Sequence, residues 1–234
     1  MTILSIETSE QACSAALSQD GALVEFLENA EGPSHQEMLP KMVSDLLSTA
    51  DSHAMPVDAV AVSGGPGSYT GLRIGVSTAK GLCYGRSIPL IGIPTLELLC
   101  VPVLLGHDLP DNALLCPMTD ARRMEVYAAV YDRGLHELRT PGADVVESRS
   151  YADWLDRGPV YFFGSGASKC KELLTRDTAH FIEGIRPSAR YMFPLAEQRI
   201  ARGRTEDVAY YEPFYLKEFQ AVKSTKLEQV LRPS

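Results

Sequence analysis

The amino-acid sequence predicts an α/β protein with mixed sheets flanked by helices, and three features of the chain lead to this fold class. The first is a series of three short strand patterns within residues 2–27, which is typical of an antiparallel meander. The second is an alternation of helix and strand patterns from residue 34 to residue 105. The third is a hydrophobic content of 45% in 234 residues, which supplies enough apolar surface for a sizeable core.

Three strands are expected at the start of the chain. Residues 2–7 alternate polar and apolar side chains, as a half-buried strand does, and residues 13–17 and 22–27 form the next two strands. Asp20 and Gly21 lie between the last two strands. Because glycine adopts a positive φ at little cost, this pair predicts a hairpin turn.

A helix is expected after these strands. Ser34 and Glu37 are three residues apart and fit a capping box. Apolar residues at helical spacing follow them: Leu39, Met42, Val43, Leu46 and Leu47. Pro40 removes one backbone hydrogen bond inside this helix, so we expect either a kink or a later start.

The remainder of the first half continues the alternation of strands and helices. Strands are expected at residues 57–62 and 89–93, and helices at residues 72–84 and 95–105. The element order through residue 105 is therefore β-β-β-α-β-α-β-α. This is the order of a ribonuclease H-like lobe.

The second half has weaker patterns. A polar stretch at residues 107–112 predicts a boundary, and residues 132–147 look irregular. Strands are expected at 114–118, 125–131, 160–163 and 181–183, and helices at 150–154 (capped by Ser150), 165–174 and 188–201, the last interrupted by Pro194. We therefore expect a first lobe over residues 1–106, a smaller second lobe over 107–215 and a surface tail over 216–234.

Composition and charge restrict the function classes. Lys and Arg number 22 and Asp and Glu number 30, so the net charge is −8, which argues against a chain that holds nucleic acid alone. No apolar run is long enough to cross a bilayer, and the start has no basic leader, so we expect a cytoplasmic protein. The five cysteines lie far apart with no C-x-x-C pair, which favours buried thiols.

The most informative motif is the glycine-rich stretch SGGPGSYTG between a buried strand and a helix. Backbone amides at such a position can point at an anion, and nearby hydroxyls can add donors. The candidate residues for an anion or nucleotide are Gly64, Gly65, Gly67, Ser68 and Thr70. The alternative is a tight strand-to-helix turn whose geometry is set by Pro66. The lysine of a P-loop is not part of this motif.

The amino-acid sequences of this loop and of two other segments resemble those of a known family. VDAVAVSGGPGSYTGLRIGVSTAKGLCYG, together with the opening ILSIETSEQACSAAL, closely resembles the bacterial TsaB family of threonylcarbamoyladenosine biosynthesis proteins. The later MTDARRMEVYAAVYD is similar to the second lobe of that family. The resemblance implies an actin-like, sugar-kinase-like fold of two lobes, in agreement with the element order above.

The resemblance also implies how such a protein acts. TsaB-like proteins form a heterodimer with TsaD, a related transferase that carries threonylcarbamoyl to the tRNA adenosine beside the anticodon, and the ATPase TsaE associates with the pair. The resemblance therefore implies a non-catalytic scaffold without a cofactor or a membrane partner, which meets tRNA only through the complex and can form a homodimer when alone.

The chain departs from the catalytic relative where that relative holds its metal. The relative has two histidines four residues apart, and Thr95 and Leu99 occupy those places here. We therefore expect no metal site and no catalytic residue. The alternative function is a small-molecule kinase or ATPase of the same fold, for which Glu7 is the candidate acid. The turn from Asp120 to Arg123 contains no glycine through which backbone could approach a phosphate, which disfavours that alternative.

If the chain acts by contact, two helices are candidates for the partner interface. Small residues follow one stripe of the second helix, which lets another helix approach closely. The flexible thioethers of the preceding helix suit an adaptable surface. The expected interface residues are Met38, Met42, Gly71, Gly75 and Ala79. The alternative is that this face packs on the protein's own sheet.

Overall fold

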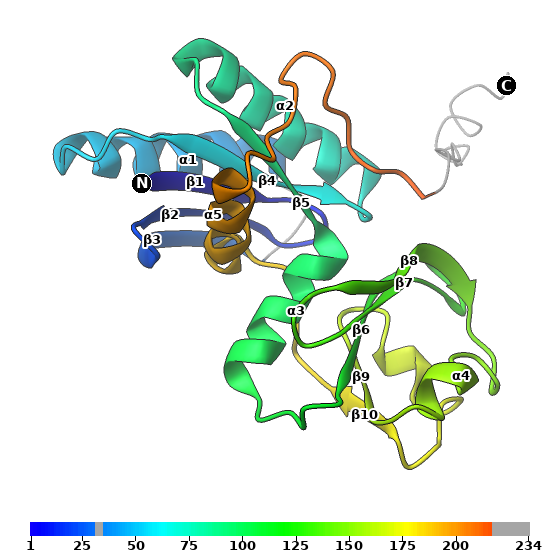
Figure 1. Ribbon diagram of the computed structural model, residues 1–234. Helices are drawn as coiled ribbons and strands as arrows, with labels where there is room; N and C mark the ends of the chain where they lie inside the picture. Colours follow the sequence, from blue (N-terminus) through cyan, green and yellow to red (C-terminus); the bar gives the residue numbers. More distant parts are fainter. Residues whose placement is uncertain (31–34, 217–234) are drawn as a thin grey trace, which may run out of the picture.

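The computed structural model describes residues 1–30 and 35–216, which form two five-stranded sheets with helices between and around them (Figure 1). The first sheet has the order β3-β2-β1-β4-β5. Its strands are β1 (Thr2–Glu7), β2 (Cys13–Gln19), β3 (Ala22–Asn29), β4 (Ala59–Gly65) and β5 (Leu90–Pro94). The predicted hairpin is confirmed, because Asp20 and Gly21 adopt φ values of 48° and 78° between β2 and β3.

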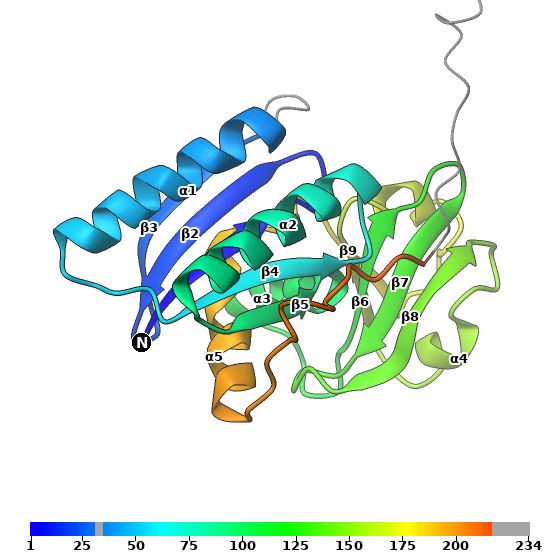
Figure 2. The ribbon, with the colours of Figure 1, turned by 90° about the horizontal axis from the view of Figure 1, so that it is seen from above.

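Helices cover both faces of this sheet. Figure 2 shows α1 (His35–Ser52) and α2 (Tyr69–Arg86) side by side over one face. On the other face, α3 (Thr95–Gly106) and α5 (Phe193–Ala201) pack against Ile3, Ile91 and Ile93. The expectation that β1 is half-buried is therefore wrong. All six of its residues are buried, because each face has a helical cover.

The second sheet repeats the strand order of the first, as β10-β9-β6-β7-β8. Its strands are β6 (Leu114–Asp120), β7 (Glu125–Tyr131), β8 (Glu137–Val145), β9 (Val160–Phe163) and β10 (Ala179–Ile182). The central strand of each sheet pairs antiparallel with the next strand in the chain and parallel with the fourth. The predicted fold class, with two lobes built on mixed sheets, is thereby confirmed.

The strand β8 corrects the expectation of an irregular stretch at residues 132–147. Pro141 and Gly142 lie inside this strand and weaken its pattern in the sequence. The strand forms the edge of its sheet, where the missing amide of a proline removes no hydrogen bond from a second neighbour.

Three helix expectations in the second half are also corrected. Residues 165–174 contain only a 3-10 turn at Ser168–Cys170, because Gly166 donates to the Met118 carbonyl and holds the chain against β6. Ser150 accepts a hydrogen bond from the Glu147 amide and does not cap α4 (Ala152–Leu155). Pro194 lies in the first turn of α5, where a proline interrupts no intrahelical bond.

Two helices tie the halves together. Leu98 and Val101 of α3 pack on the first sheet, while Leu96 and Leu99 pack on the second. The chain then returns, so that α5 lies against β1 and β5. The division into lobes over residues 1–106 and 107–215 stays a prediction, with the last helix of the second half packed on the first sheet.

The expected Ser34 cap and most of the expected tail, residues 217–234, lie outside the described residues. The first helix begins at His35 among these residues and continues past Pro40, which is exposed. All five cysteines are buried, as expected. Among residues 1–30 and 35–216, no helix combines the length and the apolar composition that spanning a bilayer requires.

Candidate functional site

The glycine loop between β4 and α2 packs tightly on other parts of the same chain. Side chains are excluded at Gly67 and Gly71, where an added Cβ would collide with the carbonyl oxygens of Ser9 and Thr8. The Ser68 amide donates to the Ser9 carbonyl at 2.6 Å. These glycines are therefore required by the β1–β2 connection that lies against them.

The other side of the loop is covered by residues 206–216, which we call the C-terminal strap. An added Cβ at Gly64 would collide with the Tyr211 hydroxyl, and one at Gly65 would lie 2.5 Å from the Phe214 carbonyl oxygen. The Phe214 amide donates to the Gly64 carbonyl at 2.7 Å. Ser68 and Thr70 remain exposed at the start of α2. Of the five candidate anion residues, these two alone project side chains from the loop.

The expected interface stripe lies inside the molecule. Gly75 faces Thr8, and Ala79 and Met42 belong to the core between α1, α2 and the first sheet. Gly71 is buried and Met38 is partly buried against the same core. The small residues therefore let α2 approach its own sheet, which favours the alternative that this face packs within the chain, and a partner interface at these five positions stays a prediction.

Glu7 lies fully buried at the end of β1. Its Oε1 accepts hydrogen bonds from both the amide and the hydroxyl of Ser9 at 2.5 Å. Its Oε2 has no hydrogen-bond partner among the described residues. Burial raises the pKa of this carboxyl to about 7, against the opposing effect of the Ser9 hydrogen bonds. Glu7 is therefore a proton-binding group near neutral pH.

A large cleft of about 1010 Å³ opens beside these residues. We call it the central cleft, because both halves of the chain line it. The first half contributes Ser9, Glu10 and the start of α2, and the second half contributes the β6–β7 turn. The Ser165 hydroxyl donates a hydrogen bond to Glu10 Oε1 at 2.5 Å, which links the two halves of the chain across the cleft. Burial raises the pKa of the Glu10 carboxyl.

The β6–β7 turn has an unusual backbone. Arg122 and Arg123 adopt φ values of 71° and 50°, a conformation that costs most non-glycine residues about 1 kcal/mol or more. Lys169 holds the turn by donating to Asp120 and to the carbonyls of Arg123 and Glu125, the last two at 2.7 and 2.6 Å. A turn without glycine is thus fixed in a glycine-like conformation by a lysine from another segment.

Thr95 and Leu99, the two positions at which the resemblance implies a loss of metal ligands, lie in the interior. Thr95 and Leu99 are both fully buried, and Leu99 packs in the core between α3 and the second sheet. Among the described residues, no group of three His, Cys, Asp or Glu side chains is close enough to hold a metal ion.

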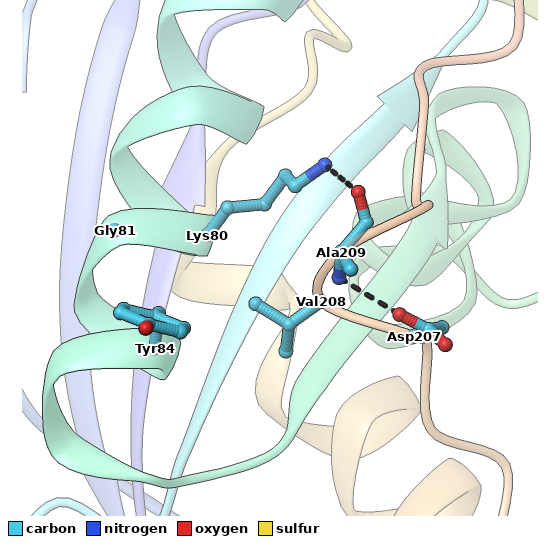
Figure 3. A pocket seen from close by; sticks show the side chains of 6 residues that line it. All are labelled: Lys80, Gly81, Tyr84, Asp207, Val208 and Ala209. Atoms are coloured by element: carbon cyan, nitrogen blue, oxygen red, sulfur yellow. Dashed lines mark hydrogen bonds between the residues drawn. The ribbon is translucent and has the colours of Figure 1, made fainter.

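A second hollow, of about 610 Å³, lies between α2 and the C-terminal strap (Figure 3). We call it the α2 hollow. It is lined by Lys80, Gly81, Tyr84, Asp207, Val208 and Ala209. Lys80 donates to the Ala209 carbonyl at 3.1 Å and closes one side, while the Tyr84 ring is 84% exposed. The sequence pattern does not indicate this hollow, because its two sides, Lys80–Tyr84 and Asp207–Ala209, lie far apart in the chain.

Comparisons with known proteins agree with one another. The model of the TsaD family, described as tRNA N6-adenosine threonylcarbamoyltransferase, matches residues 29–224. The chain is 34% identical to the tRNA threonylcarbamoyladenosine biosynthesis protein TsaB of Escherichia coli K12, over 95% of this chain and 97% of that protein. It is 33% identical to the protein of the same name from Bacillus subtilis, over 74% and 75%. The solved structure of YeaZ from Pseudomonas aeruginosa superposes with a TM-score of 0.77 at 25% identity, over 92% of this chain and 99% of that one.

Proposed function

Since this chain belongs to the TsaB family of tRNA threonylcarbamoyladenosine biosynthesis proteins, we propose that it is the non-catalytic scaffold subunit of a tRNA-modifying complex. In this proposal it forms a heterodimer with a TsaD-like transferase. It also supports recruitment of a TsaE-like ATPase. It meets tRNA only as part of the assembly.

The observation that carries the proposal is the occupied glycine loop. In a kinase or ATPase, a glycine-rich loop that binds phosphate must leave its backbone amides accessible to the nucleotide. Here Ser9 covers one side of the loop and the strap residues Tyr211 and Phe214 cover the other. This packing favours a structural role for the loop over the kinase or ATPase alternative.

The positions that correspond to the metal ligands of the catalytic relative, Thr95 and Leu99, also support a non-catalytic role. Leucine has no donor atom for a metal, and Leu99 is enclosed by the apolar residues of α3 and the second sheet. A metal-dependent catalytic role would require metal ligands elsewhere on the chain.

The outer face of α2 is the surface that we propose for the partner. Ser77, Gly81 and Gly85 are exposed and four residues apart, so small residues form a stripe opposite the buried one. A Cβ added at Gly81 or Gly85 would meet no described atom within 4 Å. Beside this stripe, the α2 hollow is open and the Tyr84 ring is exposed. A partner helix could approach the stripe closely and insert an apolar side chain into the hollow.

Reconstituted tRNA modification tests the proposal. Purified TsaD-like and TsaE-like proteins would be supplied with tRNA, ATP and the threonylcarbamoyl donor, with and without this chain. We expect threonylcarbamoyladenosine to form only when the chain is present, and the chain alone to show no ATP turnover. Modification at the full rate without the chain, or turnover by the chain alone, would contradict the proposal.

A further inference from the structure

The C-terminal strap forms part of two separate hollows. Its residues 207–209 are one side of the α2 hollow, and three residues of α2 are the other side (Figure 3). Further along the strap, Phe214, Tyr215 and Leu216 line the central cleft. If the strap left its place, the α2 hollow would therefore vanish and the central cleft would lose one wall.

The first sheet has a built seat for the strap. Val208 and Tyr211 pack against the core between α1, α2 and this sheet. The Tyr211 hydroxyl lies over Gly64 of β4 and Gly92 of β5, where an added Cβ would collide with its oxygen. Both strands thus leave room for the tyrosine ring, so the strap is docked at a specific place.

The attachment of the strap is nevertheless light. Each of its residues is half-buried or exposed. Its main chain is bonded to the first sheet near both ends, where the Glu206 amide donates to the Leu90 carbonyl at 2.9 Å and the Phe214 amide donates to the Gly64 carbonyl at 2.7 Å. Segments with little buried surface open at a lower free-energy cost than the core does. The strap is therefore the part of the first half that should open most readily.

Lys80 of α2 holds the strap between those two ends. Its Nζ donates to the Ala209 carbonyl at 3.1 Å and to the Tyr211 carbonyl at 3.0 Å. In the same stretch, Asp207 accepts the Ala209 amide with its carboxylate and the Tyr211 amide with its carbonyl, both at 2.8 Å. The stretch is thus a turn closed by its own hydrogen bonds, which keeps its shape when the strap moves.

We propose that the C-terminal strap is a conformational switch that opens and closes as one unit, with Lys80 as its latch. In the closed state the α2 hollow and the aromatic wall of the central cleft are both present, and in the open state both are lost. An apolar side chain of the transferase that fills the hollow contacts only the closed state, so its binding favours closure. This link to the partner rests on the proposed function, whereas the switch itself does not.

Hydrogen exchange at single amides tests the switch in the purified full chain, without a partner. The amides of Glu206 and Phe214 report on the two ends of the strap. We expect both to open to the same extent, and at least roughly a hundredfold more often than the amides of the central strand β1. Lys80→Met should raise exchange at both by roughly tenfold, because two hydrogen bonds from a charged donor are lost. Lys41→Met is the matched control, since Lys41 is exposed on the neighbouring helix α1.

Val208→Ala provides a second variant at one end of the strap. It trims the wall of the α2 hollow and an apolar contact with the core, so it should raise exchange severalfold. If the strap is one unit, the factor at Phe214 should equal the factor at Glu206. The proposal is overturned if the two amides respond by different factors, if they are as protected as β1, or if Lys80→Met exchanges like Lys41→Met.

The TsaD-like transferase extends the test to the partner. When the two chains co-elute, exchange at Glu206 and Phe214 should slow by at least roughly tenfold, because the filled hollow keeps the strap closed. Co-elution with unchanged exchange would refute the link between the hollow and the cleft wall. Failure of the two chains to co-elute would contradict the heterodimer, and the exchange rates of the free chain would still decide the switch.

Discussion

Gly75 of α2 lies directly against Thr8 at the end of β1, so that a Cβ on Gly75 would overlap the Thr8 hydroxyl oxygen. Thr8 is fully buried, and its hydroxyl has no hydrogen-bond partner among the described residues. One turn earlier, Gly71 faces the Thr8 carbonyl in the same way. The helix therefore reaches the β1–β2 connection only because two of its turns carry no side chain there.

Adding a methyl group at Gly75 should destabilise the protein, although alanine is the better helix former. Gly75→Ala gains about 1 kcal/mol in helix propensity but overpacks a buried contact, which typically costs about 1–3 kcal/mol. We expect a net loss of about 1 kcal/mol in the free energy of unfolding, measured with urea. Gly81→Ala is the control on the same helix and should gain about 0.5–1 kcal/mol, because no described atom lies within 4 Å of its Cβ. A stabilised Gly75→Ala would contradict the packing.

The buried Glu7 should make stability fall as the pH rises from about 4.5 to about 7. Its pKa is raised from 4.5 to about 7 by burial, so in this window the folded chain holds a proton that the unfolded chain has released. The shift corresponds to a loss of roughly 3 kcal/mol across the window. Glu7→Gln cannot ionise, so its denaturation curves should lack this fall and it should exceed the wild type most at pH 8. Exposed Glu172→Gln is the control, and parallel pH profiles for Glu7→Gln and the wild type would refute the assignment.

Lys169 should be worth more to stability than Lys171, two residues away. The Lys169 amine is mostly buried and donates to Asp120 and to two carbonyls of the strained β6–β7 turn. Lys171 makes one exposed ion pair with Glu183 at 3.2 Å. Lys169→Met should lower the free energy of unfolding by about 1 kcal/mol, because the Asp120 carboxylate and two carbonyls of the turn lose their shared donor. Lys171→Met should change it by no more than about 0.5 kcal/mol. Equal effects of the two substitutions would show that the turn is held by something else.

The first half of the fold could be predicted because its local signals agree with its tertiary structure. Asp20 and Gly21 specify a turn wherever they occur between strands, and the apolar residues of α1 repeat at helical spacing. The strand β8 could not be found in this way, because Pro141 is tolerated only by virtue of its place at a sheet edge, which is set by distant residues. The same holds for residues 165–174, where contact with β6 prevails over helix propensity.

The site was harder to predict, because small residues on one face of a helix are compatible both with a partner interface and with packing inside the chain. Glycine at positions 71 and 75 permits close approach, but the pattern does not say whether a second protein or the chain itself approaches. The answer depends on Thr8, which is far away in the sequence. The αL backbone of Arg122 and Arg123 is also hard to predict, because the local hydrogen bond from the Arg122 amide to Asp120 Oδ1 acts together with Lys169 from another segment.

Substitutions on the outer face of α2 should separate partner binding from folding. Gly81→Leu places a large side chain in the middle of the exposed stripe, and Tyr84→Ala removes the exposed ring beside the α2 hollow. Neither change touches the core, so Tyr84→Ala should keep wild-type stability to within about 0.5 kcal/mol, and Gly81→Leu should be at least as stable as the wild type because leucine is the better helix former. Each should weaken co-purification with the TsaD-like partner by roughly tenfold, because aromatic anchors and close helix approach dominate such interfaces.

A control substitution in the second half of the chain distinguishes specific binding at the outer face of α2 from non-specific association. Val145 of β8 is 65% exposed and distant from α2 in the fold, so Val145→Ala should leave pairing unchanged. Gly75→Leu is unsuitable as a probe, because the leucine would collide with Thr8 and impair folding before it could report on a partner. If Gly81→Leu and Tyr84→Ala bind the transferase as tightly as the wild type does, the partner must use another face, and the exposed stripe of small residues on α2 has no role in the heterodimer.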